Sequence, residues 1–298
     1  MKILDIPIED TFAEAFPMTA ARLIVTAVSP EWAQVAGQMA SGYAASVIGC
    51  DAEAGIERIV PPAETPDGRP GVSLLLFAFS RDALQKAVVN RVGQCVLTCP
   101  TTACYNGLPT VKDKTIRVGG NLRFFGDGHQ ISKKLDDRRF WRLPVMEGEF
   151  TCEDVFGTVK GVAGGNILIL ARTSADGLAA AEAAVKAMRQ VPGVIMPFPG
   201  GIVRSGSKVG SRYKKLRAST NDAFCPTLRG VVKSALPEEC GAVYEIVIDG
   251  LDLAAVEQAM RVGLHAACRP GVLRISAGNY GGNLGPFHMY LHKILGDS

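Results

Sequence analysis

One glutamate stands inside the mainly apolar run VYEIVID at residues 243–249, which ends in Asp249. Successive side chains of a strand point to opposite faces, so Glu245 lies on the face opposite to Tyr244 and Ile246. If a second layer covers that face, Glu245 is a buried carboxyl, and burial raises a carboxyl pKa. A carboxyl that titrates near neutrality can accept a proton and return it. The alternative that the sequence leaves open is a solvated glutamate at the edge of a sheet.

A second group of candidate residues lies in a glycine-rich, cationic segment. Residues 197–210 read PFPGGIVRSGSKVG, and residues 276–285 read SAGNYGGNLG after the last predicted strand. Glycines let backbone N–H groups approach a ligand closely. We expect the two loops to flank one cleft, with plain surface turns as the alternative. The predicted substrate-binding residues are Gly200, Gly201, Arg204, Ser205, Ser207, Lys208, Asn279 and Tyr280.

Cysteine and histidine spacings do not predict a metal site. The cysteines at 95, 99 and 104 do not fit zinc or iron–sulfur spacing, and His288 and His292 lack a third ligand. Two Cys-Pro-Thr tripeptides, at 99–101 and 225–227, are expected to be turns that line a site. Covalent catalysis by either cysteine is the less favoured interpretation, because no histidine lies nearby in sequence to activate it.

Acidic residues near the start of the chain receive a structural interpretation. Asp10 and Glu14 are four residues apart, which is about one helical turn. Carboxylates are favourable in the first turn of a helix. We therefore expect a solvated helix start there.

Two internal repeats must position these residues. In the first half, a strand at 21–28, a helix capped by Ser29 and ending at Gly42, and a strand at 43–49 are expected. The same pattern returns with a strand at 72–79, a helix from Ser80 to Gly93, and a strand at 94–99. Residues 61–71 form the turn-rich link between the two copies.

The second half repeats the pattern with longer helices. The expected elements are a strand at 166–171, a helix capped by Ser174, and a strand from 194. Their copies are a strand at 244–249, a helix capped by Asp252, and a strand at 272–276. Each half is β-α-β twice over, which predicts an α+β protein of two ferredoxin-like (βαββαβ) lobes. We place the lobes at residues 1–145 and 146–298, joined within the polar segment 127–148.

Composition limits the possible partners. The chain has 298 residues and a net charge of +3, which predicts neither nucleic-acid nor membrane-surface binding. No apolar run reaches the ~20 residues that span a bilayer. The first residues, MKILDIPIED, carry acids where a signal peptide would be apolar. We expect a soluble cytoplasmic protein with reduced thiols.

Nine segments in order resemble one family, the formylmethanofuran:tetrahydromethanopterin formyltransferases. The resemblance runs along nearly the whole chain, and the nine segments together are far more specific than any one of them. They are IEDTFAEAFP (8–17), AEAGIE (52–57), PPAETPDGRPG (61–71), GQCVLTCPTTA (93–103), GVAGGN (161–166), PFPGGIVRSGSKVG (197–210), CPTLRGVV (225–232), YEIVIDG (244–250) and ISAGNYGG (275–282).

The resemblance implies an acyltransferase of one-carbon metabolism with two ferredoxin-like lobes. It implies transfer of a formyl group between N5 of tetrahydromethanopterin and the amine of methanofuran, which are substrates, with no covalently bound cofactor. A strand glutamate is the proposed proton shuttle of the family, and its position here is Glu245. Both carriers have anionic tails, which the cationic run 204–217 would hold.

The resemblance also implies partners. Members associate as dimers or tetramers, and bacterial members work with the other subunits of a formyltransferase/hydrolase complex that releases formate. A non-catalytic subunit that binds the pterin or methanofuran is the first alternative. An RNA-binding module with the same element order is the second, although the predicted strands lack its aromatic residues.

Overall fold

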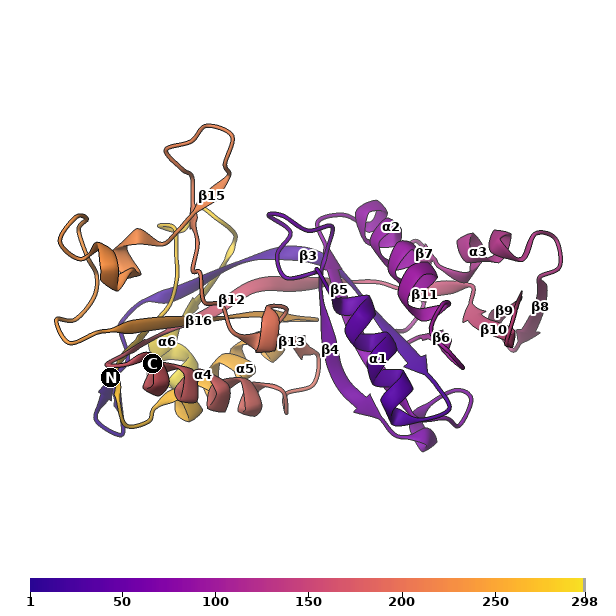
Figure 1. Cartoon of the computed structure of the whole chain (residues 1–298), viewed down its shortest axis with the longest axis horizontal. Coiled ribbons are helices and arrows are strands. Elements are labelled where there is room, and N and C mark those ends of the chain that lie inside the picture. The colour runs from indigo at the N-terminus through magenta and orange to yellow at the C-terminus, as the bar shows by residue number, and fades with distance from the viewer. Residues whose placement is uncertain (297–298) are drawn as a thin grey trace. The chain divides into compact units, whose positions relative to one another are not determined.

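The structure is a computed structural model, and it describes residues 1–296 (Figure 1). It is a mixed α/β structure with a large mixed sheet. Contacts divide the chain into two compact units. The central unit comprises Met18–Gly161, and the terminal unit comprises Met1–Pro17 with the chain from Val162 onward. The lobes predicted at 1–145 and 146–298 do not share these limits, and they stay a prediction.

The central unit begins in β3 (Phe12–Thr26), whose first residues belong to the terminal unit. The following elements are α1 (Pro30–Ser41), β4 (Glu53–Val60), β5 (Gly71–Ala78), α2 (Arg81–Arg91) and β6 (Ala103–Asn106). Their strands lie in the order β4-β5-β3-β6, with antiparallel neighbours. The sheet continues through β10 (Gly148–Glu153), β9 (Arg138–Val145) and β8 (Ile131–Leu135). The unit also contains β7 (Thr115–Arg117), α3 (Gly119–Leu122) and β11 (Val155–Gly157).

Both helix starts predicted in this unit are confirmed. The Ser29 hydroxyl accepts the N–H of Trp32, and the Ser80 hydroxyl accepts the N–H of Ala83. A serine at this position satisfies one of the free N–H groups at a helix start. Helix α1 ends at Ser41 with Gly42 as its C-cap, as predicted.

Two strands predicted in this unit are wrong. Residues 43–49 form turns, in which the Glu53 carboxylate accepts the N–H of Val47, and the strand starts only at Glu53. Residues 92–96 continue α2 as a π-helical turn, which buries Val92 and Val96 against the core. Those two apolar residues are four apart, which is a helical spacing, so helix packing outweighs their β-propensity.

The terminal unit repeats the arrangement. Its elements are β12 (Val159–Ala171), α4 (Ser174–Met188), β13 (Val194–Ile195), β16 (Ala242–Gly250), α5 (Leu253–Ala267) and β17 (Val272–Ser276). The strands lie in the order β13-β16-β12-β17 and are antiparallel. The cap of α4 is Thr173, not the predicted Ser174, because the Thr173 hydroxyl accepts the N–H of Asp176. Asp252 caps α5 as predicted.

Further elements complete the terminal unit. They are β1 (Lys2–Ile3), β2 (Ile6–Pro7), the hairpin of β14 (Lys208–Val209) and β15 (Ala218–Ser219), β18 (Phe287–Tyr290) and α6 (Leu291–Leu295). Within residues 1–296, none of the helices is both long and apolar enough to cross a bilayer.

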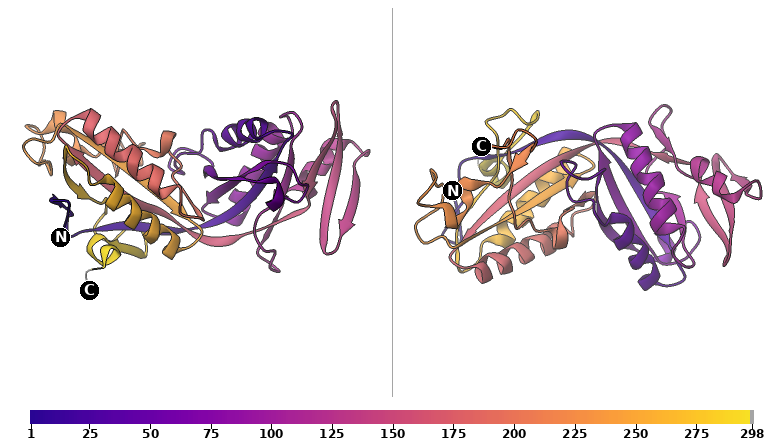
Figure 2. Two further views of the ribbon diagram at one scale, coloured as in Figure 1. Left: turned by 90° about the horizontal axis from the view of Figure 1, so that it is seen from below. Right: turned by 45° about the horizontal axis from the view of Figure 1, so that its top comes forward.

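The two faces of the terminal sheet are covered differently. Helices α4 and α5 lie side by side on one face (Figure 2), where Ile246 and Ile248 join the main core of the unit. The opposite face carries a smaller apolar cluster, in which buried Leu168 and Leu170 meet Phe224 from the long segment before β16. Glu245 alternates with Ile246, so its side chain belongs to this second face.

Candidate functional site

Glu245 lies in β16 beside Val203 of the first glycine-rich loop. Its backbone exchanges two hydrogen bonds with Val203, at 3.1 and 2.7 Å, and it pairs with Leu168 of β12 on its other side. A cavity of about 380 Å³ opens at this point. Its lining consists of Leu168, Ser174, Val203–Gly206, Asn221, Phe224–Thr227 and Gly241–Glu245, all of them in the terminal unit.

The Glu245 carboxyl is the strongly perturbed group of this cavity. Burial raises its pKa from an ordinary value of 4.5 to about 7. Among the described residues, none donates a hydrogen bond or forms an ion pair that would offset this loss of hydration. The sequence left undecided whether the face of β16 that carries Glu245 is covered or solvated, and the structure shows that it is covered. A carboxyl that is half protonated near neutrality is suited to exchanging protons with a ligand in the cavity.

The raised pKa of Glu245 predicts a pH-dependent change in stability. Between pH 4.5 and about 7 the unfolded chain has released a proton that the folded state retains. The free energy of unfolding therefore falls as pH rises through this window. Glu245→Gln removes the effect, so the variant is expected to be more stable than wild type at pH 8 by about 1–3 kcal/mol, and equally stable near pH 4.5. Calorimetric unfolding at both pH values measures this, and equal differences at the two would contradict it.

The first glycine-rich loop contributes residues to the cavity only in part. Arg204 and Ser205 line it, and both are exposed. Gly200 and Gly201 do not line it. Their φ angles of 68° and 88° turn the chain back, and a Cβ on Gly201 would lie 2.8 Å from Val185. These glycines position the loop, and direct ligand contact by either of them stays a prediction.

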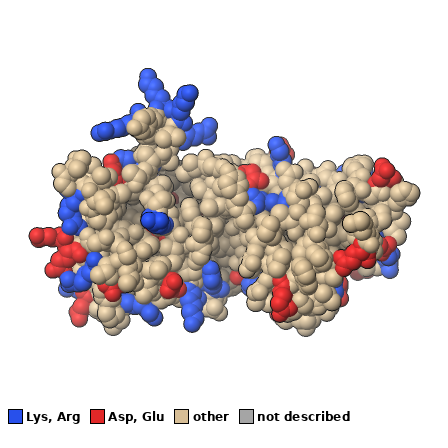
Figure 3. Space-filling view, in the orientation of Figure 1, with Lys and Arg blue, Asp and Glu red and all other residues tan. Residues whose placement is uncertain are grey.

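Ser207 and Lys208 lie just beyond the cavity lining. The Lys208 ammonium pairs with the Asp222 carboxylate at 2.6 Å, and this hydrogen bond lowers the Asp222 pKa. Most of the cationic run follows in the β14–β15 hairpin, where basic side chains gather in Figure 3. Within residues 1–296, these exposed cations have no acidic partner; they are Arg212, Lys214, Lys215 and Arg217.

The second glycine-rich loop is organised around Glu14. The prediction of a solvated helix start at residues 10–14 is wrong, because Glu14 belongs to β3 and is only 1% exposed. Its carboxylate accepts backbone N–H groups from Tyr280, Gly282, Leu284 and Gly285. Burial alone would raise the Glu14 pKa, but these four donors outweigh burial and hold the pKa below its usual range.

These contacts decide where the second loop meets the first. The Asn279 amide nitrogen donates to the Thr11 hydroxyl and to the Phe12 carbonyl. The Tyr280 hydroxyl donates to the Ser207 carbonyl at 3.2 Å. Burial raises the Tyr280 pKa, and the charge of Glu245 raises it further. The loops therefore meet at Tyr280, while four N–H groups of the second loop, those of Tyr280, Gly282, Leu284 and Gly285, bind Glu14 and are not free to bind a ligand.

The turn at 225–227 lines the cavity, as predicted for the Cys-Pro-Thr tripeptides. The Cys225 thiol contacts the Thr220 hydroxyl and the Asn221 carbonyl, each at 3.3 Å. Sequence reasoning did not find Asn221, Phe224 or Ser174 as lining residues. The repeated tripeptide was the signal for this turn, and no comparable pattern marks the other three.

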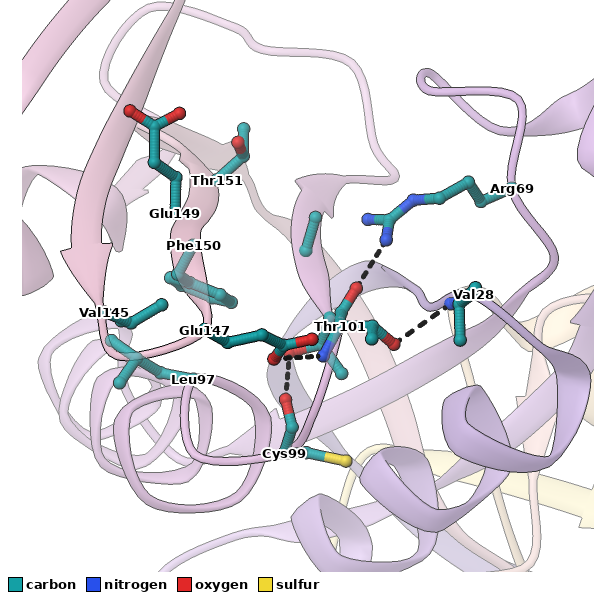
Figure 4. A pocket seen from close by; sticks show the side chains of 12 residues that line it. Val28, Arg69, Leu97, Cys99, Thr101, Val145, Glu147, Glu149, Phe150 and Thr151 are labelled. Atoms are coloured by element: carbon teal, nitrogen blue, oxygen red, sulfur yellow. Dashed lines mark hydrogen bonds between the residues drawn. The ribbon is translucent and has the colours of Figure 1, made fainter.

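Cys99 and Thr101 of the tripeptide at 99–101 line a second cavity, of about 300 Å³, within the central unit (Figure 4). Thr101 has a φ of 65°, which is unusual for a β-branched residue. Its N–H donates to the Glu147 carboxylate at 2.9 Å, its hydroxyl accepts the N–H of Val28, and its carbonyl accepts from Arg69. Burial, and then the charge of Glu147, raises the pKa of the Cys99 thiol. A thiol with a raised pKa is a poor nucleophile at neutral pH.

The fold and the first cavity define a class of protein. A half-buried carboxyl with a pKa near neutrality, surrounded by hydroxyl and backbone groups on a mixed α/β fold, is typical of an enzyme site that transfers protons. Residues 1–145 match the model of the formylmethanofuran-tetrahydromethanopterin formyltransferase family, and residues 148–294 match the model of its proximal lobe. The chain belongs to this family.

Individual relatives agree with the family match. The formylmethanofuran–tetrahydromethanopterin formyltransferase of Methylococcus capsulatus is 58% identical over 99% of this chain and 100% of the relative. A protein of Methylorubrum extorquens that is named as a component of the formyltransferase/hydrolase complex is 55% identical over 97% of this chain and 96% of the relative.

Solved structures agree as well. A chain in the crystal structure of the Methylorubrum extorquens formyltransferase/hydrolase complex with methylofuran superimposes with a TM-score of 0.96 at 52% identity, over 100% of this chain and 99% of that chain. The Methanosarcina barkeri formyltransferase gives a TM-score of 0.94 at 48% identity, over 99% of this chain and 100% of that chain.

Proposed function

We propose that this protein is an enzyme that transfers a formyl group directly between N5 of tetrahydromethanopterin and the amine of methanofuran. Membership of the formyltransferase family supports the reaction class and both substrates. The main observation in support of the mechanism is the Glu245 carboxyl. It lies in a cavity, and its pKa is about 7. The reaction belongs to one-carbon metabolism.

Formyl transfer between two amines needs one proton relay and one anion site. The acceptor nitrogen attacks the formyl carbon, which forms a C–N bond and a tetrahedral oxyanion. The attacking nitrogen then loses a proton, the old C–N bond breaks, and the departing nitrogen gains a proton. Glu245 accepts the first proton and supplies the second, so no net proton is consumed. Its pKa suits both steps at neutral pH.

The oxyanion needs donors that are not already engaged. The backbone N–H groups of Tyr280, Gly282, Leu284 and Gly285 bind Glu14. We therefore assign this role to residues on the walls of the cavity. Ser205 and Thr227 offer hydroxyl groups there, and Arg204 offers a positive charge at the rim. The other predicted substrate-binding side chains would then contact the substrate outside the cavity; they are Ser207, Lys208, Asn279 and Tyr280. Gly200 and Gly201 would shape the loop. The exposed cations at 212–217 would hold an anionic substrate tail.

The architecture and associations of the chain belong to the same proposal. The strand orders β4-β5-β3-β6 and β13-β16-β12-β17 both support ferredoxin-like lobes. The relative named as a component of a complex supports assembly with hydrolase subunits. Association into dimers or tetramers is a separate part of the proposal, which follows from the resemblance to the family. We place the protein in the cytoplasm.

A two-carrier assay tests the proposed activity. Purified protein is mixed with formylmethanofuran and tetrahydromethanopterin, and formation of formyltetrahydromethanopterin is followed. Transfer that depends on both carriers, without release of formate, is the expected result. Binding of either carrier without any transfer would instead identify a non-catalytic binding protein and overturn the proposal.

A further inference from the structure

Glu14 is a buried carboxylate whose partners are backbone groups. It is 1% exposed, and within the part of the chain that the structure describes it forms no ion pair. Four N–H groups bind it, at 2.8 Å from Tyr280, 3.2 Å from Gly282 and 3.0 Å from Gly285, with Leu284 as the fourth. Burying a charge is costly unless its hydrogen bonds are complete. This arrangement is therefore sensitive to any loss of an acceptor oxygen.

The loop at 280–285 has the backbone needed to wrap around one carboxylate. Gly281 and Gly282 have φ angles of 69° and 80°, and such conformations let several N–H groups converge on one anion. A Cβ on Gly285 would lie 2.2 Å from the Ala15 carbonyl oxygen, so this position admits no side chain. Two of the glycines that suggested a ligand-binding loop, Gly282 and Gly285, thus bind a carboxylate of the same chain.

The loop held by Glu14 is connected to the cavity through one side chain. Tyr280 donates its N–H to Glu14 and its hydroxyl to the Ser207 carbonyl. Ser207 directly follows Val203–Gly206, which lines the cavity, and Val203 is hydrogen-bonded to the backbone of Glu245. The effect of the Glu245 charge on the Tyr280 pKa agrees with their proximity. An unbroken series of contacts therefore leads from Glu14 to Glu245.

We propose that Glu14 is a positioning residue of the Glu245 site. By binding the four N–H groups at 280–285, it fixes the Tyr280 hydroxyl on Ser207 and thereby the position of the segment 203–206 beside Glu245. The kinetic part of this inference rests on the proposed function, whereas its structural part does not. Glu14 acts through Tyr280, and it does not touch the substrate.

Glu14→Gln tests the inference at constant side-chain size. The amide replaces one acceptor oxygen with an NH2 group that faces N–H donors, so part of the ring of hydrogen bonds is lost. We expect amide hydrogen exchange to rise in both 280–285 and 203–207. We also expect kcat/KM to fall about 10- to 100-fold, mainly through kcat, because the cavity wall is misplaced. The matched control is Glu182→Gln, an exposed glutamate of α4 in the same unit, which should leave both measurements unchanged.

Tyr280→Phe separates positioning from a general loss of structure. This variant removes only the hydroxyl that binds Ser207, so exchange should rise in 203–207 while 280–285 stays protected. If Glu14 acts through Tyr280, the double variant should be no slower than the more impaired single variant. Additive losses in kcat/KM, or unchanged exchange at 203–207 in Tyr280→Phe, would overturn the inference. The exchange results need no substrate, so they remain decisive if the proposed reaction fails, and Tyr280→Phe remains decisive if Glu14→Gln does not fold.

Discussion

Glu245→Gln is expected to lower kcat for formyl transfer by about 10²- to 10⁴-fold, which is the usual contribution of a general acid–base group. The amide has nearly the same size as the carboxyl but cannot accept a proton from the attacking nitrogen. Ground-state contacts in the cavity are retained, so KM should change little. The variant needs no repacking, because the Glu245 side chain accepts no hydrogen bond from the described residues.

The pH dependence of transfer provides a sharper version of the same prediction. In wild type, Glu245 must be ionised to accept the first proton, so kcat/KM should rise with pH and level off above about 7. In Glu245→Gln this rise should disappear. Glu182→Gln serves again as the control and should keep the wild-type profile. A variant that retains more than a tenth of wild-type kcat, with the same pH profile, would show that Glu245 is not the proton relay.

The repeated βαβ pattern could be predicted from the sequence because its signals are local. Ser29, Ser80 and Asp252 each cap a helix within three residues of their own position. The strands predicted at 43–49 and 94–99 failed for the opposite reason. Whether Val92 and Val96 face a core as helix or strand depends on residues far along the chain.

The candidate site was predictable to a similar degree. Alternation along β16 identified the face of Glu245, and two of the candidate residues of the first glycine-rich loop, Arg204 and Ser205, line the same cavity. Glu14 was misinterpreted because its partners lie about 270 residues away, and no local pattern reveals that distance. A glycine-rich loop in isolation looks the same whether its N–H groups bind a substrate or a carboxylate of the same chain. Only the fold distinguishes the two cases.

The largest effect on stability is expected in the central unit, at the ion pair of Arg22 and Glu57. The guanidinium donates two hydrogen bonds to the Glu57 carboxylate, at 2.7 and 2.6 Å, and the Ser73 hydroxyl adds a third at 2.6 Å. The Glu57 side chain is only 2% exposed. Arg22→Met leaves this buried charge without its cation, so the free energy of unfolding should fall by about 3 kcal/mol.

The matched control for Arg22→Met is the double variant Arg22→Met/Glu57→Leu, which removes the charge together with its partner. Replacing a whole buried ion pair by apolar residues is often close to neutral, so the double variant should recover most of the loss. Both tryptophans of the chain, Trp32 and Trp141, lie in the central unit, so their fluorescence reports its unfolding in urea. If the double variant is no more stable than Arg22→Met, the loss comes from packing of the arginine stem and not from the uncompensated charge of Glu57.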